Sequence, residues 1–177
     1  MKNMKKALIM AIGGAALMGA AGAHAIDVQY PGTYTFKGET TLSASFITAT
    51  CDLSLTGDVD AAGNVSVTTG SVSGSASVCS NIVLQNFPWT GTADTSNYTL
   101  PLSGIEVSIL GGLVTCSGNI VAGFSNGSPT DADPSFFALN NAQFGICSVT
   151  GDLVVQGGTD INTVSYTHLT LPTISSV

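Results

Sequence analysis

The stretch that decides the fold class is ITATCDLSLT, residues 47–56. Small apolar side chains alternate here with threonine, serine and aspartate, one for one along the whole stretch. Because successive side chains of a β-strand point to opposite faces, this period of two gives one apolar face and one polar face. Cys51 falls on the apolar face, so the stretch predicts a strand that buries its cysteine.

The same alternation recurs along the chain and predicts an all-β fold. Cys116 and Cys147 again fall on the apolar side of their segments. Between the alternating segments lie glycine-, serine- and asparagine-rich turn signals, and no stretch after residue 25 has a helical period long enough to predict a helix. We therefore expect an antiparallel β-sandwich, Ig-like or a related barrel. Further strands are predicted at 65–67, 82–87, 105–109, 114–124 and 147–155, and turns at 60–64, 70–74, 126–129 and 157–158.

The N-terminus has the three parts of a secretory signal peptide. A basic start, MKNMKK, precedes an apolar run from Ala7 and a small-x-small site at 23–25. We expect residues 1–25 to be removed, with Ile26 as the mature N-terminus. An uncleaved anchor is the alternative, although the Gly/Ala-rich run matches poorly the roughly 20 strongly apolar residues of a spanning helix. The protein is thus predicted to be secreted through the periplasm, to the cell surface or the extracellular space.

The C-terminal stretch VSYTHLTLPT, residues 164–173, reads as the translation of a sequencing-library adapter, a transposon mosaic end running into its read primer. We therefore expect residues 164–177 not to be native and the true C-terminus to be missing. A native strand with Thr-Leu alternation is the alternative. The predicted single β domain spans residues 26–163.

The four cysteines, Cys51, Cys79, Cys116 and Cys147, all lie in this domain. An even number of cysteines in an oxidising compartment favours two disulfides. Three pairings are open. The sequential one is favoured because it encloses segments of similar length, with separations of 28 and 31 residues. A zinc tetrathiolate is a weaker alternative, since the chain has no Cys-x-x-Cys spacing.

The charged residues of the domain exclude several functions. Residues 26–163 contain one lysine (Lys37), no arginine, no histidine and all eleven acidic residues, for a formal charge of −10. One lysine cannot neutralise the phosphates of a nucleic acid or anchor a protein to anionic lipid. Without histidine there is no Ser-His-Asp triad, Cys-His pair or histidine-bound zinc. Carboxylate chemistry, as in glycosidases, and cation binding by oxygen ligands stay open. No acidic residue has a sequence context that singles it out, so we predict no catalytic residue, no metal site and no cofactor. The acidic stretch 58–64 resembles the start of a calcium loop but lacks its closing glutamate, so it predicts a hairpin turn.

Phe87-Pro88-Trp89 is the candidate ligand-binding motif and contains the single tryptophan. An aromatic-Pro-aromatic step can offer an exposed platform to an apolar or sugar ligand, because tryptophan has a large amphipathic face. A core plug that ends a strand is the interpretation that the motif favours over this platform.

Together these features resemble the Pseudomonas-type alkane-oxidation activator proteins, the PraA/PraB group. The resemblance extends over most of residues 33–155, with Phe87 where leucine is expected before Pro-Trp. It rests on the strand at 46–55 with Cys51, the Gly/Asp turn that follows, Cys79, the step FPWTG at 87–91, and Cys116 and Cys147 before a closing strand.

The resemblance implies a secreted, non-enzymatic protein of a Gram-negative bacterium, associated with growth on hydrocarbons and with cell-surface adhesion or biofilm. Expected partners are cell-surface or extracellular matrix components, a hydrocarbon or surfactant, and further copies of the chain. Two alternatives stay open. One is an extracellular module that binds an apolar or carbohydrate ligand near Trp89. The other is a fimbrial or coat-like subunit completed by a partner strand.

Overall fold

The computed structural model describes residues 25–95, 97–127, 134–157 and 160–166. The predicted signal peptide lies outside the described residues except for Ala25. The predicted adapter-derived tail also lies outside them except for residues 164–166, which form part of a short strand.

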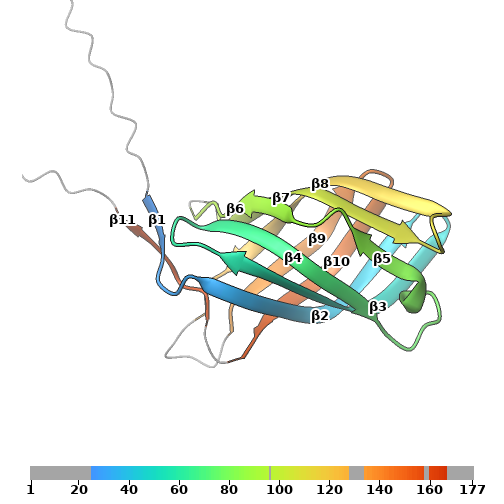
Figure 1. The fold of residues 1–177 in the computed structure, drawn as a ribbon, viewed down its shortest axis with the longest axis horizontal. Coiled ribbons are helices and arrows are strands. Elements are labelled where there is room, and N and C mark those ends of the chain that lie inside the picture. Colours follow the sequence, from blue (N-terminus) through green and yellow to red (C-terminus); the bar gives the residue numbers. More distant parts are fainter. Residues whose placement is uncertain (1–24, 96, 128–133, 158–159, 167–177) are drawn as a thin grey trace, which may run out of the picture.

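Antiparallel strands make up most of the described chain (Figure 1). One short 3-10 helix, η1, interrupts them, and no helix in the described part is long and apolar enough to cross a membrane. The elements are β1 (Ala25–Val28), β2 (Gly32–Ala44), β3 (Ile47–Val59), β4 (Asn64–Ser73), η1 (Cys79–Asn81), β5 (Ile82–Gln85), β6 (Trp89–Thr92), β7 (Thr99–Ile109), β8 (Val114–Ser125), β9 (Phe136–Phe144), β10 (Cys147–Gln156) and β11 (Thr163–Tyr166).

The main sheet closes on itself into a barrel of eight strands. Its order is β7-β6-β4-β3-β2-β10-β9-β8, and a ladder between β7 and β8 completes the circle. β5 pairs with β7 beyond the end of β6, and β1 pairs with β11 in a separate two-stranded sheet. The all-β prediction is confirmed, but the sheet forms a barrel and not a two-sheet sandwich. The related barrel is the correct member of that prediction, because one sheet curls to meet its own edge instead of two sheets packing face to face.

Glycines inside long strands let the sheet curl this tightly. β2 and β3 are each 13 residues long and pair along their whole length. At Gly38 of β2, a Cβ atom would lie 1.8 Å from the carbonyl oxygen of Asp152 in β10. No other residue permits that approach, and glycine in a strand interior typically marks a bend at a barrel corner.

The interior of the barrel is apolar and its outer surface is mostly hydroxylated. The alternation of 47–56 appears directly in β3, where Ala49, Cys51 and Leu55 are buried. On the outside, threonine hydroxyls of β2 and β3 pair across the strands, with Thr41 and Thr50 oxygens 2.9 Å apart. Cross-strand threonine pairs of this kind stabilise a sheet modestly without using charge.

Both disulfides follow the sequential pairing that the sequence favoured. Cys51 of β3 is bonded to Cys79 of η1, with Cα atoms 5.7 Å apart. Cys116 of β8 is bonded to Cys147 of β10, with Cα atoms 5.8 Å apart. All four cysteines are buried, as the alternating segments predicted for Cys51, Cys116 and Cys147. The second disulfide ties together two strands that are separated in the barrel by β9.

Candidate functional site: an apolar cavity around Trp89

A sideways step in the chain places Trp89 inside the barrel. β5 and β6 pair with the same strand, β7, and residues 86–88 connect them. Asn86 takes a left-handed conformation, with φ of 60°, which asparagine tolerates better than most residues. Its side-chain amide donates a hydrogen bond of 2.9 Å to the carbonyl oxygen of Gly104, at the bulge of β7. Pro88 has no N–H to donate to a ladder, so the strand breaks here.

Trp89 is buried, with 4% of its surface exposed. Its indole N–H donates a hydrogen bond of 2.8 Å to the carbonyl oxygen of Gln85, so the polar atom of the ring has a partner inside the barrel wall. Phe87 is half-buried and stacks on the indole, with ring centroids 4.7 Å apart, while Pro88 is exposed. The motif is therefore not an exposed aromatic platform. Ligand binding by Phe87, Pro88 and Trp89 stays a prediction, and of the three only Trp89 lines the cavity described next.

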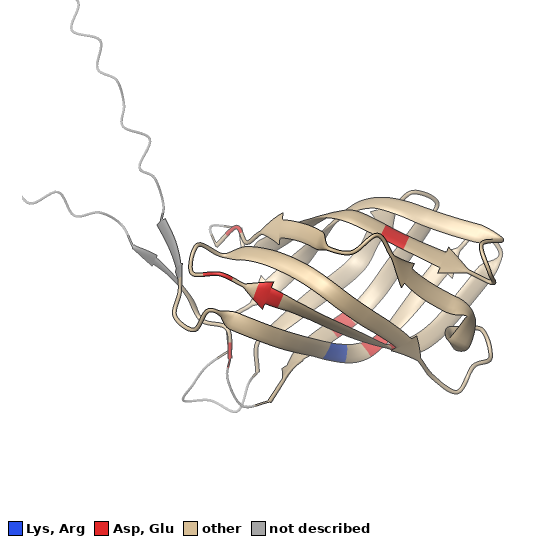
Figure 2. Ribbon diagram, viewed as in Figure 1, with Lys and Arg blue, Asp and Glu red and all other residues tan. Residues whose placement is uncertain are grey.

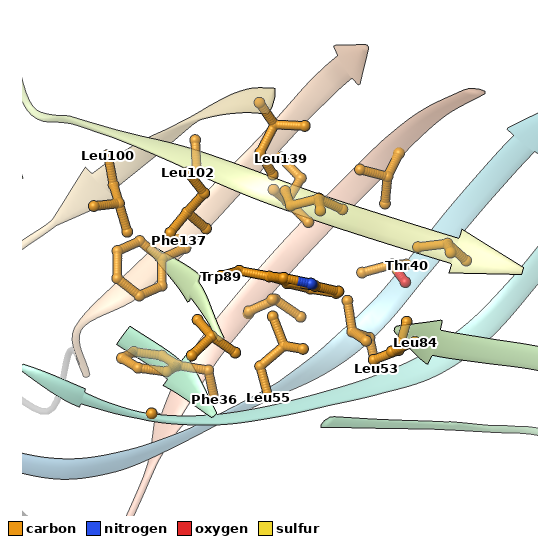
Figure 3. A pocket seen from close by; sticks show the side chains of 18 of the residues that line it. Phe36, Thr40, Leu53, Leu55, Leu84, Trp89, Leu100, Leu102, Phe137 and Leu139 are labelled. Carbon is orange, nitrogen blue, oxygen red and sulfur yellow. The ribbon is translucent and has the colours of Figure 1, made fainter. Parts of the chain in front are cut away.

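A cavity of about 90 Å³ surrounds the indole inside the barrel. All eight barrel strands and β5 contribute side chains to its lining. Figure 3 shows the indole lying across the middle of this space, with Leu102 and Leu139 on one side and Leu53 and Leu55 on the other. Residues far apart in the sequence thus meet around one aromatic ring.

The lining offers a ligand almost no polar group. Its only hydroxyls belong to Thr40 and Thr56, and both are already hydrogen-bonded. Thr40 donates to the carbonyl oxygen of Cys51 at 3.4 Å, and the Thr56 hydroxyl oxygen lies 2.9 Å from that of Thr35. None of the lining side chains titrates, since its one cysteine, Cys51, is in a disulfide. Such a space suits an apolar guest and excludes a charged one, because burying an unpaired charge is very costly.

The barrel wall has a seam beside the cavity. The ladder between β4 and β6 stops at Val67, and no β-ladder joins the described residues 68–73 of β4 to β5. Side chains close this gap. A Cβ atom at Gly70 would lie 2.8 Å from Cδ1 of Leu84, so the missing side chain of β4 leaves room for the leucine of β5. Leu53, Val72 and Leu84 line the cavity and are only half-buried, so the wall is thinnest here.

This seam corrects one turn prediction. The small residues of 70–74 were expected to form a turn, but Gly70 to Ser73 continue β4 and pair with β3. Their small size serves packing at the seam and does not reverse the chain. Gly70 is visible in the sequence, but no residue near it indicates that Leu84 fills the space beside it.

The acidic turn behaves as predicted. Residues 60–64 form the hairpin between β3 and β4, and the Asp60 carboxylate accepts hydrogen bonds from the backbone N–H groups of Ala62 and Asn64. The Asn64 side-chain amide also donates to it, and this bond is the main reason why the pKa of Asp60 lies below its usual value. In the part of the chain that the structure describes, no three His, Cys, Asp or Glu side chains come together as a metal site.

The fold and the cavity define a class: a small disulfide-bonded β-barrel with an apolar interior. The particular family follows from a family model described as alkane oxidation protein activator PraA/PraB-like, which matches residues 1–163. The chain belongs to this family, as the resemblance in its sequence predicted. No curated protein and no solved structure matches the chain. The family description connects the protein with activation of alkane oxidation, and the two disulfides are consistent with a periplasmic or extracellular protein.

Proposed function

We propose that this protein is an exported, non-enzymatic activator of alkane oxidation that takes part of a hydrocarbon chain into its barrel. The observation that carries the proposal is the apolar cavity around Trp89. The family description supplies the link with alkanes, and the cavity supplies a place where an alkane can be held.

The size of the cavity sets how a ligand enters. An engineered cavity of about 150 Å³ with an apolar lining takes benzene, whereas the present one measures about 90 Å³. A hydrocarbon chain therefore needs side chains to move. The seam is where movement costs least, because side-chain packing across Gly70 and Leu84 is easier to rearrange than a hydrogen-bonded ladder.

The chemistry of the lining favours an alkane over the other candidate ligands. A sugar needs several hydrogen-bond partners, but both threonine hydroxyls of the lining are already engaged. An alkanoate would bring a carboxylate into a space without a cation, since the one lysine of the described residues, Lys37, is exposed. A neutral hydrocarbon has neither difficulty, so we favour the apolar form of the binding-module hypothesis over its carbohydrate form.

Export, adhesion and the absence of catalysis belong to the same proposal. Disulfides persist in oxidising compartments, which supports export. Contact with cell-surface or matrix components, self-association and a part in biofilm follow from the family resemblance alone. A non-enzymatic role is supported by the cavity itself, because its lining contains no group that could act as an acid, base or nucleophile. No observation on the described strands favours a fimbrial subunit.

Fluorescence of Trp89, the single tryptophan, tests the binding. Hexane added to the full chain should change the emission in a saturable way. Hexanoate has the same number of carbons and should bind at least about 100-fold more weakly, because its charge would be buried without a partner. Absence of a saturable change with hexane would reject the cavity as a binding site.

A matched pair of variants locates the site. Ala122 lines the cavity and Ala49 is buried outside its lining. We expect Ala122→Leu to fill the space and weaken hexane binding by at least about tenfold, and Ala49→Leu, where it folds, to leave the affinity unchanged. Equal affinities for Ala122→Leu and the natural sequence would contradict the proposal.

A further measurement separates activation from catalysis. The protein should raise hexadecane oxidation by alkane-degrading cells and leave hexadecane unchanged when no cells are present.

A further inference from the structure

Three turns at one end of the barrel carry large apolar side chains into solvent. Phe46 between β2 and β3 is 76% exposed, Leu113 between β7 and β8 is 69% exposed, and Ile146 between β9 and β10 is 66% exposed. Leu110, in the same turn as Leu113, is also exposed. We call these four residues the apolar tip.

Strand register places the three turns side by side. Ala44 of β2 pairs with Ile47 of β3 and with Cys147 of β10, so the turns before Ile47 and Cys147 are neighbours. The disulfide from Cys147 to Cys116 brings the start of β8, and with it the β7–β8 turn, to the same end. This is the right-hand end of the barrel in Figure 1, opposite β1 and β11.

Folding does not require these side chains to be apolar. Ser45-Phe46 and Gly145-Ile146 are two-residue hairpin loops, with positive φ at Ser45 and Gly145. Such turns usually hold small or polar residues, and an exposed Phe or Ile adds nothing to the core. Leu110 has φ of 52°, a left-handed conformation that is unusual for a bulky residue. Large apolar residues therefore occupy positions where turn chemistry would favour polar ones.

The end of the barrel that carries the apolar tip has no charged residue in its connections, whereas acidic residues gather toward the other end. The four connections at the tip end, residues 45–46, 74–81, 110–113 and 145–146, contain no charged residue. Asp58, Asp60, Asp94 and Asp160 lie in or beside the connections at the other end, where Figure 2 shows several red segments. Glu39, Asp52, Glu106 and Asp152 lie within strands between the two ends. The molecule is thus polarised along its length, with an apolar uncharged end and an acidic end.

We infer that the apolar tip inserts into the hydrocarbon side of an oil–water interface, with the acidic end in water. A bare hydrocarbon surface carries no charge and is fluid, so it can take up three separate protruding turns without matching their shape. An anionic lipid surface fits less well, because the tip has no cation and the domain is acidic.

A second copy of the chain is a poorer partner for the apolar tip than a hydrocarbon surface. Four partly exposed side chains offer on the order of 400 Å², if a fully buried aromatic contributes about 150–250 Å². Each partner in a stable interface contributes about 800 Å².

The seam lies in the tip half of the barrel, since Ile82 of β5 pairs with Ile109, next to Leu110. Insertion would therefore bring hydrocarbon close to the seam, a consequence that rests on the proposed function, whereas insertion itself does not.

Partition of the full chain onto hexadecane droplets tests the inference. The variant Phe46→Ser/Leu113→Ser/Ile146→Ser should bind droplets at least about 100-fold more weakly, because each lost side chain removes apolar area from the contact. The matched control Tyr30→Ser/Tyr98→Ser/Val121→Ser removes three side chains that are 46%, 59% and 60% exposed and lie away from the tip. It should stay within about threefold of the natural sequence. Equal effects of the two triple variants would overturn the inference.

Orientation gives a second readout that does not depend on the triple variant. In a Trp89→Phe background, tryptophan is placed either at the tip (Phe46→Trp) or toward the acidic end (Tyr98→Trp). Droplets should shift the emission of the first to the blue and leave the second unchanged. Blue shifts at both positions would mean spreading or unfolding on the oil and would overturn the inference. So would tighter binding to phosphatidylcholine vesicles than to droplets, or a dimer in sedimentation that the tip variant abolishes.

Discussion

Replacement of Trp89 by alanine tests whether the indole is the central packing element of the barrel. The side chain is 4% exposed, lies across the cavity and donates its N–H to Gln85. Truncation of a buried aromatic to alanine costs about 3–5 kcal/mol, and more when the site cannot collapse. A closed barrel with a cavity of about 90 Å³ already beside the ring has little freedom to collapse. We therefore expect a loss in the free energy of unfolding toward the upper end of that range.

Urea unfolding followed by far-UV circular dichroism measures this loss, because the variant has no tryptophan to report. Phe46→Ala is the control: it truncates an aromatic that is mostly exposed, and its effect should stay within about 0.5 kcal/mol. Hexane should raise the unfolding midpoint of Trp89→Ala more than that of the natural sequence, since a ligand that binds only the folded state stabilises it. A loss below about 1 kcal/mol for Trp89→Ala would refute the central role of the indole.

Three further predictions concern the framework. Ser135→Ala should cost roughly 2–4 kcal/mol, because the buried hydroxyl accepts from the N–H groups of Gly127 and Ile161 and donates to the Ile161 carbonyl; the exposed Ser71→Ala, with no measurable loss, is the control in the same urea experiment. Asp60→Asn should weaken folding at neutral pH, since a lowered pKa in the folded state stabilises above the unfolded pKa and that contribution disappears as the pH falls. The urea midpoints of Asp60→Asn and of the natural sequence are compared at pH 7 and pH 2. A larger difference between the two proteins at pH 2 than at pH 7 would contradict the predicted pH dependence. Cys51→Ala/Cys79→Ala should cost roughly 3–4 kcal/mol from the 28-residue separation that the disulfide closes; calorimetry showing an unchanged melting temperature would contradict the prediction.

Much of the framework was predictable because it follows from local patterns. The alternation in 47–56 gave the strand and the buried face of Cys51, and both proved correct. The disulfide pairing that was favoured because it encloses two segments of similar length is also confirmed. The hairpin at Asp60 was recognised because asparagine, glycine and aspartate have turn preferences that neighbours rarely override.

The candidate site was predictable only in part. The sequence singled out Trp89 and favoured a buried plug over an exposed platform, which is confirmed for Trp89. The cavity around the indole was not predicted, because it depends on the connection at Asn86 and on the bulge of β7 that receives it. The composition of 70–74 predicts a turn, because a stretch of small residues looks the same whether it reverses the chain or makes room for Leu84. The apolar tip was not recognised, since Phe46, Leu113 and Ile146 are separate single residues in the sequence.

By itself, the sequence determined that the chain is all-β and that Cys51, Cys116 and Cys147 face inward. Only the tertiary structure decided that the sheet closes into a barrel, that Trp89 lies inside it, and that three apolar turns gather at one uncharged end. The physical reason is how far apart in the sequence the interacting residues lie. The alternation of side chains is fixed by the backbone of each strand, whereas closure and the grouping of turns depend on register between strands that are far apart in the chain.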